Sequence, residues 1–162
     1  MKRLAALAVG LCALAGAAHS QEIVRGGDPK SPIASVVTVP PGYETIYVSG
    51  LTPAVVNKDA TGPAMFGGDT KTQTMSVLTR IQDTLKSQGA TMADVVMMRV
   101  LLVGDPAKDG KMDFAGMMEA YKTFFGTAEQ PNKPARITSQ VASLVQPGML
   151  VEIEVQAAKK VK

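Results

Sequence analysis

The strongest structural constraint in this chain is an alternation of side chains near its C-terminal end. Val151, Ile153 and Val155 fall on one side of an extended chain, and Glu152 and Glu154 fall on the other. A period of two residues is typical of a β-strand with one buried face and one open face. The chain is therefore expected to build a sheet that other elements cover on one side.

A second predicted strand begins near Arg136, and a turn signal, Pro147–Gly148, separates it from the alternating strand. We predict that the two strands pair as a hairpin, which would bring the Arg136 guanidinium and the Glu152 carboxylate to one pocket. A guanidinium can bind a planar carboxylate through two parallel hydrogen bonds, and a glutamate can hold or activate water. From spacing alone, a structural ion pair of Arg136 with Glu152 or Glu154 is the stronger interpretation, because such pairs are common on strands.

Residues 1–20 have the composition of a secretory signal peptide. Met1-Lys2-Arg3 is a positive start, 4–18 is an apolar core of suitable length, and Ala18-His19-Ser20 offers small residues at the cleavage positions. We predict cleavage after Ser20 and a secreted, periplasmic location. The alternative, an N-terminal helix packed on the domain, would need a wholly buried site because the run has no polar face.

Removal of this segment would change the chemistry that the protein can use. The only cysteine and the only histidine, Cys12 and His19, both lie in it. The remaining chain could form no disulfide, no Ser-His-Asp triad and no His/Cys metal site. Catalysis would depend on Arg, Glu, Asp, Lys, Tyr, hydroxyl and backbone groups and water, and we expect no cofactor.

The charge of the processed chain gives no sign of a nucleic-acid surface. The formal net charge is +3 for the whole sequence and falls to about +1 once the two basic residues of the signal are removed. A nucleic-acid surface would need clustered lysines and arginines, which the chain lacks. We therefore expect no nucleic-acid partner, and no membrane association after cleavage.

The remaining pattern predicts a single α+β domain with the order β-β-α-β-α-β-β. Residues 21–30 have no periodicity and are predicted to form a flexible lead, and residues 159–162 a solvated basic tail. The elements between are a hairpin of 35–39 and 45–49, a helix from Asp69 or Thr70 to Gln88, a strand over 94–103, a helix over 113–125, and the two C-terminal strands. Two helices would cover one face of a mixed sheet, so the other face is expected to pack in a homo-oligomer.

Several further residues are interpreted as structural. The strand over 94–103 is continuously apolar and is expected to be covered on both faces, with Arg99 as an interruption. We favour an edge or interface ion pair over a ligand contact for Arg99. The methionines and Tyr121 of the second helix fit the helical period and are interpreted as packing residues.

Six short blocks of this sequence are similar to those of one known family and follow the same order. They are Ser31-Pro32-Ile33, Tyr47–Pro53, Gly67–Asp69 with Gln73-Thr74, Asp113–Ala115 with Tyr121 and Phe124-Phe125, Pro134–Arg136, and Val151–Glu154. Together they resemble the reactive intermediate deaminase (Rid, or YjgF) family over residues 31–158.

This resemblance implies a chorismate-mutase-like α+β fold that assembles as a homotrimer, with the sheets lining a central barrel and three pockets at the subunit interfaces. It also implies hydrolysis of reactive enamine and imine intermediates. The model substrate is 2-aminoacrylate, a small carboxylate, and the products are a 2-keto acid and ammonia.

Site residues follow from the same resemblance, position by position. Arg136 matches the arginine that clamps the substrate carboxylate, and Glu152 matches the glutamate that holds the hydrolytic water. Thr138 matches a small residue whose backbone contacts the ligand, and Ser49-Gly50 match the pocket wall. The resemblance makes the clamp the preferred interpretation of Arg136, while Glu154 is expected to be structural.

Two residues depart from the family pattern and bear on function. Val36 stands where the family has an aromatic residue, often tyrosine, and Met118 stands where asparagine is common. Two other functions stay open: a non-catalytic trimer that binds small metabolites, and a chaperone-like protein that acts through an apolar surface.

Overall fold

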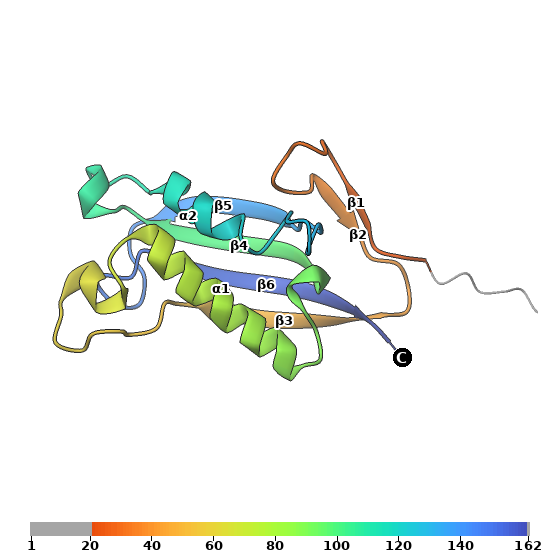
Figure 1. Ribbon diagram of the computed structural model, residues 1–162, viewed down its shortest axis with the longest axis horizontal. Helices are drawn as coiled ribbons and strands as arrows, with labels where there is room; N and C mark the ends of the chain where they lie inside the picture. The colour runs from red at the N-terminus through yellow and green to blue at the C-terminus, as the bar shows by residue number, and fades with distance from the viewer. Residues whose placement is uncertain (1–20, 162) are drawn as a thin grey trace, which may run out of the picture.

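A four-stranded sheet with two helices on one face forms the body of the protein (Figure 1). The computed structural model describes residues 21–161, so the predicted signal segment lies outside the described residues. No helix in this described range has both the length and the apolar composition that a membrane span requires. The strands are β1 (Val24–Gly26), β2 (Val36–Thr38), β3 (Tyr43–Leu51), β4 (Val95–Val103), β5 (Ala135–Val141) and β6 (Val151–Lys160); the helices are α1 (Thr70–Ser87) and α2 (Phe114–Tyr121), with short 3-10 turns at Gly62–Phe66, Met92–Asp94 and Pro106–Lys108.

The main sheet has the strand order β3-β6-β4-β5. Strand β6 is antiparallel to β3 and β4, whereas β5 runs parallel to β4, so the sheet is mixed, as predicted. The predicted hairpin between β5 and β6 is wrong because β4 lies between them. The apolar β4 finds a hydrogen-bonding partner on each of its two edges in this way, and the Pro147–Gly148 turn reverses the chain without making its two flanks neighbours.

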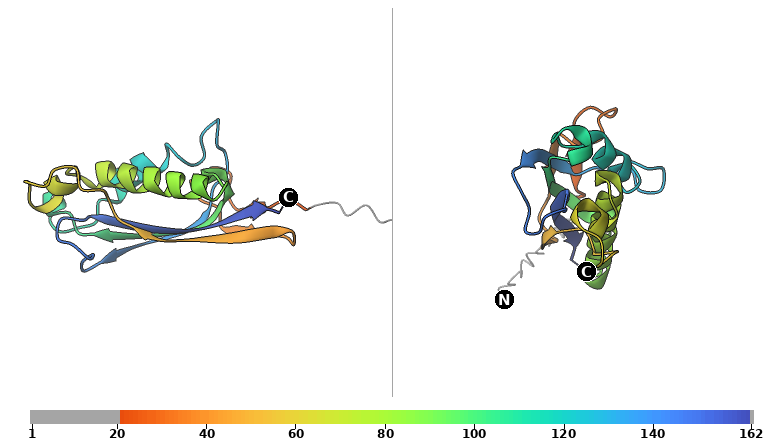
Figure 2. Two further views of the ribbon diagram at one scale, coloured as in Figure 1. Left: turned by 90° about the horizontal axis from the view of Figure 1, so that it is seen from below. Right: turned by 90° about the vertical axis from the view of Figure 1, so that its left-hand side faces the viewer.

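Both helices lie on the same face of this sheet, which Figure 2 shows edge-on. On that face β4 contributes Met98, Val100 and Leu102, none of which is exposed to solvent. The alternate residues of β4 point to the open face, where Arg99 is exposed. The expectation that β4 is covered on both faces is therefore wrong within a single protomer. The apolar run of β4 instead reflects the central position of this strand in the sheet.

Helix α1 has the bounds that its sequence predicts. Asp69 caps it by accepting a hydrogen bond from the Thr72 backbone N–H at 2.7 Å, and this bond holds the pKa of the Asp69 carboxyl below its usual value. Gly89 ends it in a left-handed conformation with φ of 67°. Helix α2 was predicted over 113–125, but it begins at Phe114 with Asp113 as its N-cap and ends at Tyr121, so Phe124 and Phe125 lie after the helix.

Two predictions for the N-terminal region are wrong. Residues 24–26, expected in a flexible lead, form strand β1, and β1 pairs with β2 in a separate small sheet. The predicted hairpin of β2 with β3 does not form, because β3 pairs along the longer β6. Arg25 holds β1 in place by donating hydrogen bonds from Nη2 to the carbonyls of Ala93 and Val95. These contacts across the fold order a segment that has no local pattern.

The predicted basic tail is also ordered in its first half. Lys159 and Lys160 belong to β6 and lie opposite Glu44 and Tyr43 of β3. Lys159 pairs with Glu44 at 2.8 Å, and Lys160 pairs with Glu22 at 2.7 Å. The Lys159–Glu44 pair joins neighbouring strands, and the Lys160–Glu22 pair joins β6 to the segment before β1, so both lysines have fixed partners.

Candidate active site

Arg136 lies on β5, the edge strand beside α2, and its side chain points toward the helices. It pairs in register with Met98, which is wholly buried under the helical layer. The guanidinium lies 4.5 Å from the ring centroid of Tyr121 and 5.8 Å from that of Phe114, and Nη1 is 4.0 Å from the Met117 sulfur. A packed face of α2 thus fixes the position of this cation.

The charge of Arg136 has no counterion in the described part of the chain. None of the ion pairs among residues 21–161 includes it. Burial lowers the pKa of its guanidinium, and the nearby Tyr121 opposes this effect. Because an arginine stays protonated in proteins, Arg136 is a half-buried positive charge with no carboxylate partner in the described part of the chain. The structural ion pair with Glu152 or Glu154 is therefore absent within one protomer, and the guanidinium is free to bind an anion.

The Tyr121 ring, against which the Arg136 guanidinium packs, is itself held in place by two contacts. Its hydroxyl donates a 3.0 Å hydrogen bond to the Pro32 carbonyl, and its ring stacks on Phe125 at a centroid distance of 4.9 Å. Burial raises the pKa of Tyr121 to about 12, so the phenol stays protonated near neutral pH. These contacts confirm the prediction that Tyr121 is a packing residue. The sequence did not indicate a further role, in which the Tyr121 ring packs against the Arg136 guanidinium.

Thr138 shares the helix-side face of β5 with Arg136. It pairs in register with Val100, which is fully buried. Its hydroxyl oxygen is buried and has no hydrogen-bond partner. An unsatisfied buried hydroxyl costs free energy, which a ligand accepting or donating a bond there would recover. Thr138 therefore places a buried, unpaired hydroxyl on the same face of β5 as Arg136.

Glu152 lies on the opposite face of the sheet. Val151 and Ile153 on either side of it are buried against the helices, so the Glu152 carboxylate projects to the open face. A register shift in the β3–β6 pairing falls between Val48 and Leu51, at Ser49 and Gly50. A Cβ atom at Gly50 would overlap the Glu152 carboxylate, so only glycine lets β3 pass this side chain in its present position.

Arg99 and Glu154 form an ion pair beside Glu152. They are register partners on β4 and β6, with 2.5 Å between Nη1 and Oε1. This confirms an ion pair as the interpretation of Arg99, on a central strand instead of at an edge. Glu152, Arg99, Glu154, Gly50 and Leu101 together line a small hollow on the open face.

The two predicted catalytic residues do not meet within one protomer. Arg136 faces the helices, Glu152 faces away from them, and β4 separates their strands. The structure places Arg136 and Thr138 on one face of β5 and brings Glu152 beside Gly50 on the other side of the sheet, with Ser49 in the adjoining register shift of β3. One substrate could contact both places only where a second protomer brings its own copy of one of them.

Phe114 and Met117 are contacts of Arg136 that the sequence pattern assigned to the core. The signal that could have found them is the helical spacing of Phe114, Met117 and Tyr121 in α2, followed by an arginine near the start of the next strand. No group of three or more His, Cys, Asp or Glu side chains gathers in a way that could hold a metal ion within residues 21–161.

Comparison with known proteins gives one family and many similar structures. The family model described as Endoribonuclease L-PSP matches residues 29–159. A Rid-family protein of unknown function from Yersinia pestis is 26% identical, with 79% of this chain and 87% of that chain covered and a TM-score of 0.62. A YjgF/YER057c/UK114-family member from Mycobacterium tuberculosis is 28% identical, with coverage of 85% and 98% and a TM-score of 0.52. These similarities confirm the chorismate-mutase-like α+β fold.

Proposed function

Because the chain belongs to the Endoribonuclease L-PSP family, in which the Rid and YjgF proteins fall, we propose that it is a hydrolytic deaminase. Its substrates would be reactive enamines and imines that resemble 2-aminoacrylate, and its products a 2-keto acid and ammonia. The observation that carries this proposal is the half-buried Arg136 guanidinium, which packs against Tyr121 and Phe114 and has no counterion within residues 21–161.

The proposed reaction needs few catalytic groups. The substrate carboxylate binds the Arg136 guanidinium, and the enamine takes up a proton at carbon to become the protonated imine (iminium ion). A water molecule on Glu152 adds to the C=N carbon while Glu152 accepts its proton. Glu152 returns this proton to the nitrogen of the resulting carbinolamine. The C–N bond then breaks while the hydroxyl group loses its proton to solvent, which releases ammonia and leaves the keto group. Positioning and modest proton transfer suffice because such imines hydrolyse readily.

The opposite orientations of Arg136 and Glu152 support the proposed homotrimer. In a ring with threefold symmetry, one surface of each protomer meets a different surface of the next, so each junction can combine Arg136 of one copy with Glu152 of its neighbour. The open face also carries apolar side chains that solvent reaches in the single protomer, among them Ile137, which is 49% exposed. Covering this face in an assembly would remove them from water.

We also propose that the protein is exported to the periplasm. This rests on the predicted signal peptide of residues 1–20 alone, which lies outside the described residues. Mass determination of the exported protein tests it, because cleavage after Ser20 would leave a chain that begins at Gln21.

The test of the activity is a turnover assay with the purified processed protein. 2-Aminoacrylate is generated in situ, and pyruvate release is timed with and without the protein. Acceleration over the spontaneous rate is the expected result. Thermal stabilisation by 2-keto acids with no acceleration would instead establish the non-catalytic binding protein. An RNA substrate is included because of the family's description, and cleavage of RNA without pyruvate release would contradict the proposal.

Gly50→Ala should separate activity from folding. The added Cβ collides with the far end of the flexible Glu152 side chain, which can move away at little cost in stability, typically below about 1 kcal/mol. We expect kcat/KM to fall about tenfold or more, because the water-holding carboxylate is displaced. Kinetics and a thermal melt of the same sample check this. Unchanged kinetics would show that the position of Glu152 does not matter.

A further inference from the structure

A groove runs along the outer side of α2, beside the loop that precedes β2. Its floor is apolar and consists of Pro32, Phe114, Ala115 and Met118, and its volume is about 480 Å³. That volume lies within the range of about 300 to 1,000 Å³ that is usual for small-molecule sites. Phe114 is 43% exposed in the groove, although a phenylalanine of the helical layer would normally be covered.

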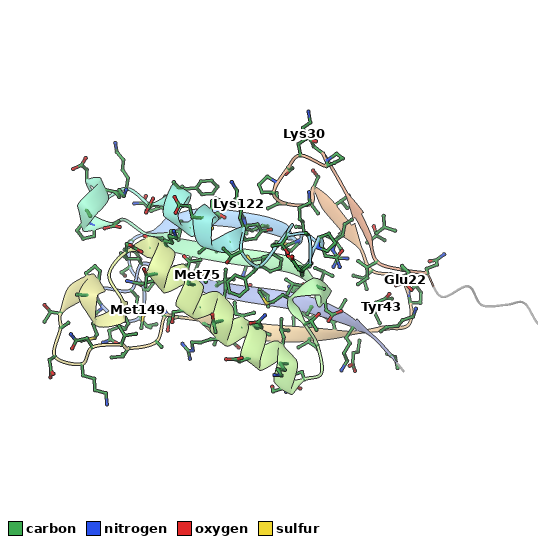
Figure 3. The ribbon with its side chains drawn as sticks, in the orientation of Figure 1. Glu22, Lys30, Tyr43, Met75, Lys122 and Met149 are labelled. Carbon is green, nitrogen blue, oxygen red and sulfur yellow. The ribbon has the colours of Figure 1, made fainter. Side chains whose placement is uncertain are left out.

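The edges of the groove carry two lysines, Lys30 from the loop and Lys122 from the end of α2. Figure 3 labels both, Lys122 at the end of α2 and Lys30 on the loop between β1 and β2. Both lysines are exposed, and neither forms an ion pair within residues 21–161. The groove's one carboxylate, that of Glu119, is already neutralised by Lys71 at 2.9 Å. The groove therefore combines an apolar floor with two lysine ammonium groups at its edges.

We propose that this groove binds an amphipathic organic anion, with an apolar chain along the floor and a terminal carboxylate at Lys30 and Lys122. The apolar chain would remove the exposed Phe114 ring from water, which is favourable in proportion to the area covered. The carboxylate would gain the attraction of two ammonium groups that form no ion pair among residues 21–161. A fully apolar ligand would leave both charges unused, and a small anion would leave the floor open.

This site is distinct from that of Arg136. Phe114 contributes to both, because the Arg136 guanidinium lies 5.8 Å from its ring, but neither Arg136 nor Thr138 lines the groove. Binding in the groove does not depend on the proposed deaminase activity.

The experiment is a calorimetric titration with decanoate, carried out in an Arg136→Ala background so that the carboxylate clamp cannot contribute. One decanoate per protomer is the expected result. Lys30→Glu with Lys122→Glu should weaken binding at least about tenfold. The matched control, Lys58→Glu with Lys108→Glu, changes the same charge at exposed lysines outside the groove and should leave binding unchanged. Butyrate, which keeps the charge and loses most of the chain, should bind at least about tenfold more weakly.

Three results would overturn the proposal. The first is absence of decanoate binding, and the second is equal affinity in the two double-lysine variants. The third is equal affinity for butyrate and decanoate, which would show that the apolar floor takes no part. Because the changed lysines are exposed, the variants are expected to fold, and circular dichroism spectra of both double variants check this.

Discussion

Replacing Arg136 with alanine should reduce kcat/KM for the imine derived from 2-aminoacrylate by about a hundredfold to a thousandfold. Removing one partner of a buried, hydrogen-bonded charge pair typically costs 2–5 kcal/mol or more, and about 1.4 kcal/mol corresponds to a factor of ten. Timed pyruvate release measures the change. Arg136→Lys should also be impaired, because a lysine keeps the charge but cannot make two parallel hydrogen bonds to a carboxylate.

The stability of the same variant separates the clamp from a structural role. Without substrate, Arg136 is a half-buried cation with no counterion in the described part of the chain, and such a charge does not stabilise the fold. We therefore expect the melting temperature of Arg136→Ala to be equal to that of the wild type or higher. Arg80→Ala, at an exposed arginine of α1, is the matched control and should keep full activity. Wild-type turnover in Arg136→Ala, or a large loss of stability, would contradict the clamp.

Elements with a strong local pattern were predictable from the sequence. The period of α1 with its Asp69 cap and Gly89 end, and the alternation of Val151, Ile153 and Val155, each describe one element and its buried side. The pairing of strands has no such local signal. A Pro-Gly turn shows that the chain reverses, but which strand lies next to which depends on contacts between distant segments, and both predicted hairpins failed for this reason.

The orientation of Arg136 shows why the site was only partly predictable. In β5 the residues that face the helices are Arg136, Thr138 and Gln140, all polar, while Ile137 on the alternate side is half exposed. Hydrophobic patterning alone would predict the opposite orientation of this strand, with Ile137 facing the helices. Residues that face a helical layer are normally apolar, and the polar residues of β5 that face α2 depart from this rule. Such departures concentrate at functional sites.

Trimers that contain both an Arg136→Ala chain and a Glu152→Gln chain should regain activity that neither variant has alone. In the proposed cyclic trimer, each site would join Arg136 of one protomer to Glu152 of the next. Any mixed trimer, whether it holds one or two copies of either variant, then has one junction in which both residues are intact. Purified mixed trimers should therefore show about a third of wild-type activity per trimer.

The two variants can be co-expressed with different affinity tags, and purification on both tags isolates the mixed assemblies. Each variant taken through the same steps alone is the control and should stay inactive. If the two residues acted within one protomer, every chain in the mixture would lack one of them and no activity would return. The orientation of the side chains argues for recovery, because within a single chain the sheet itself stands between the guanidinium and the carboxylate.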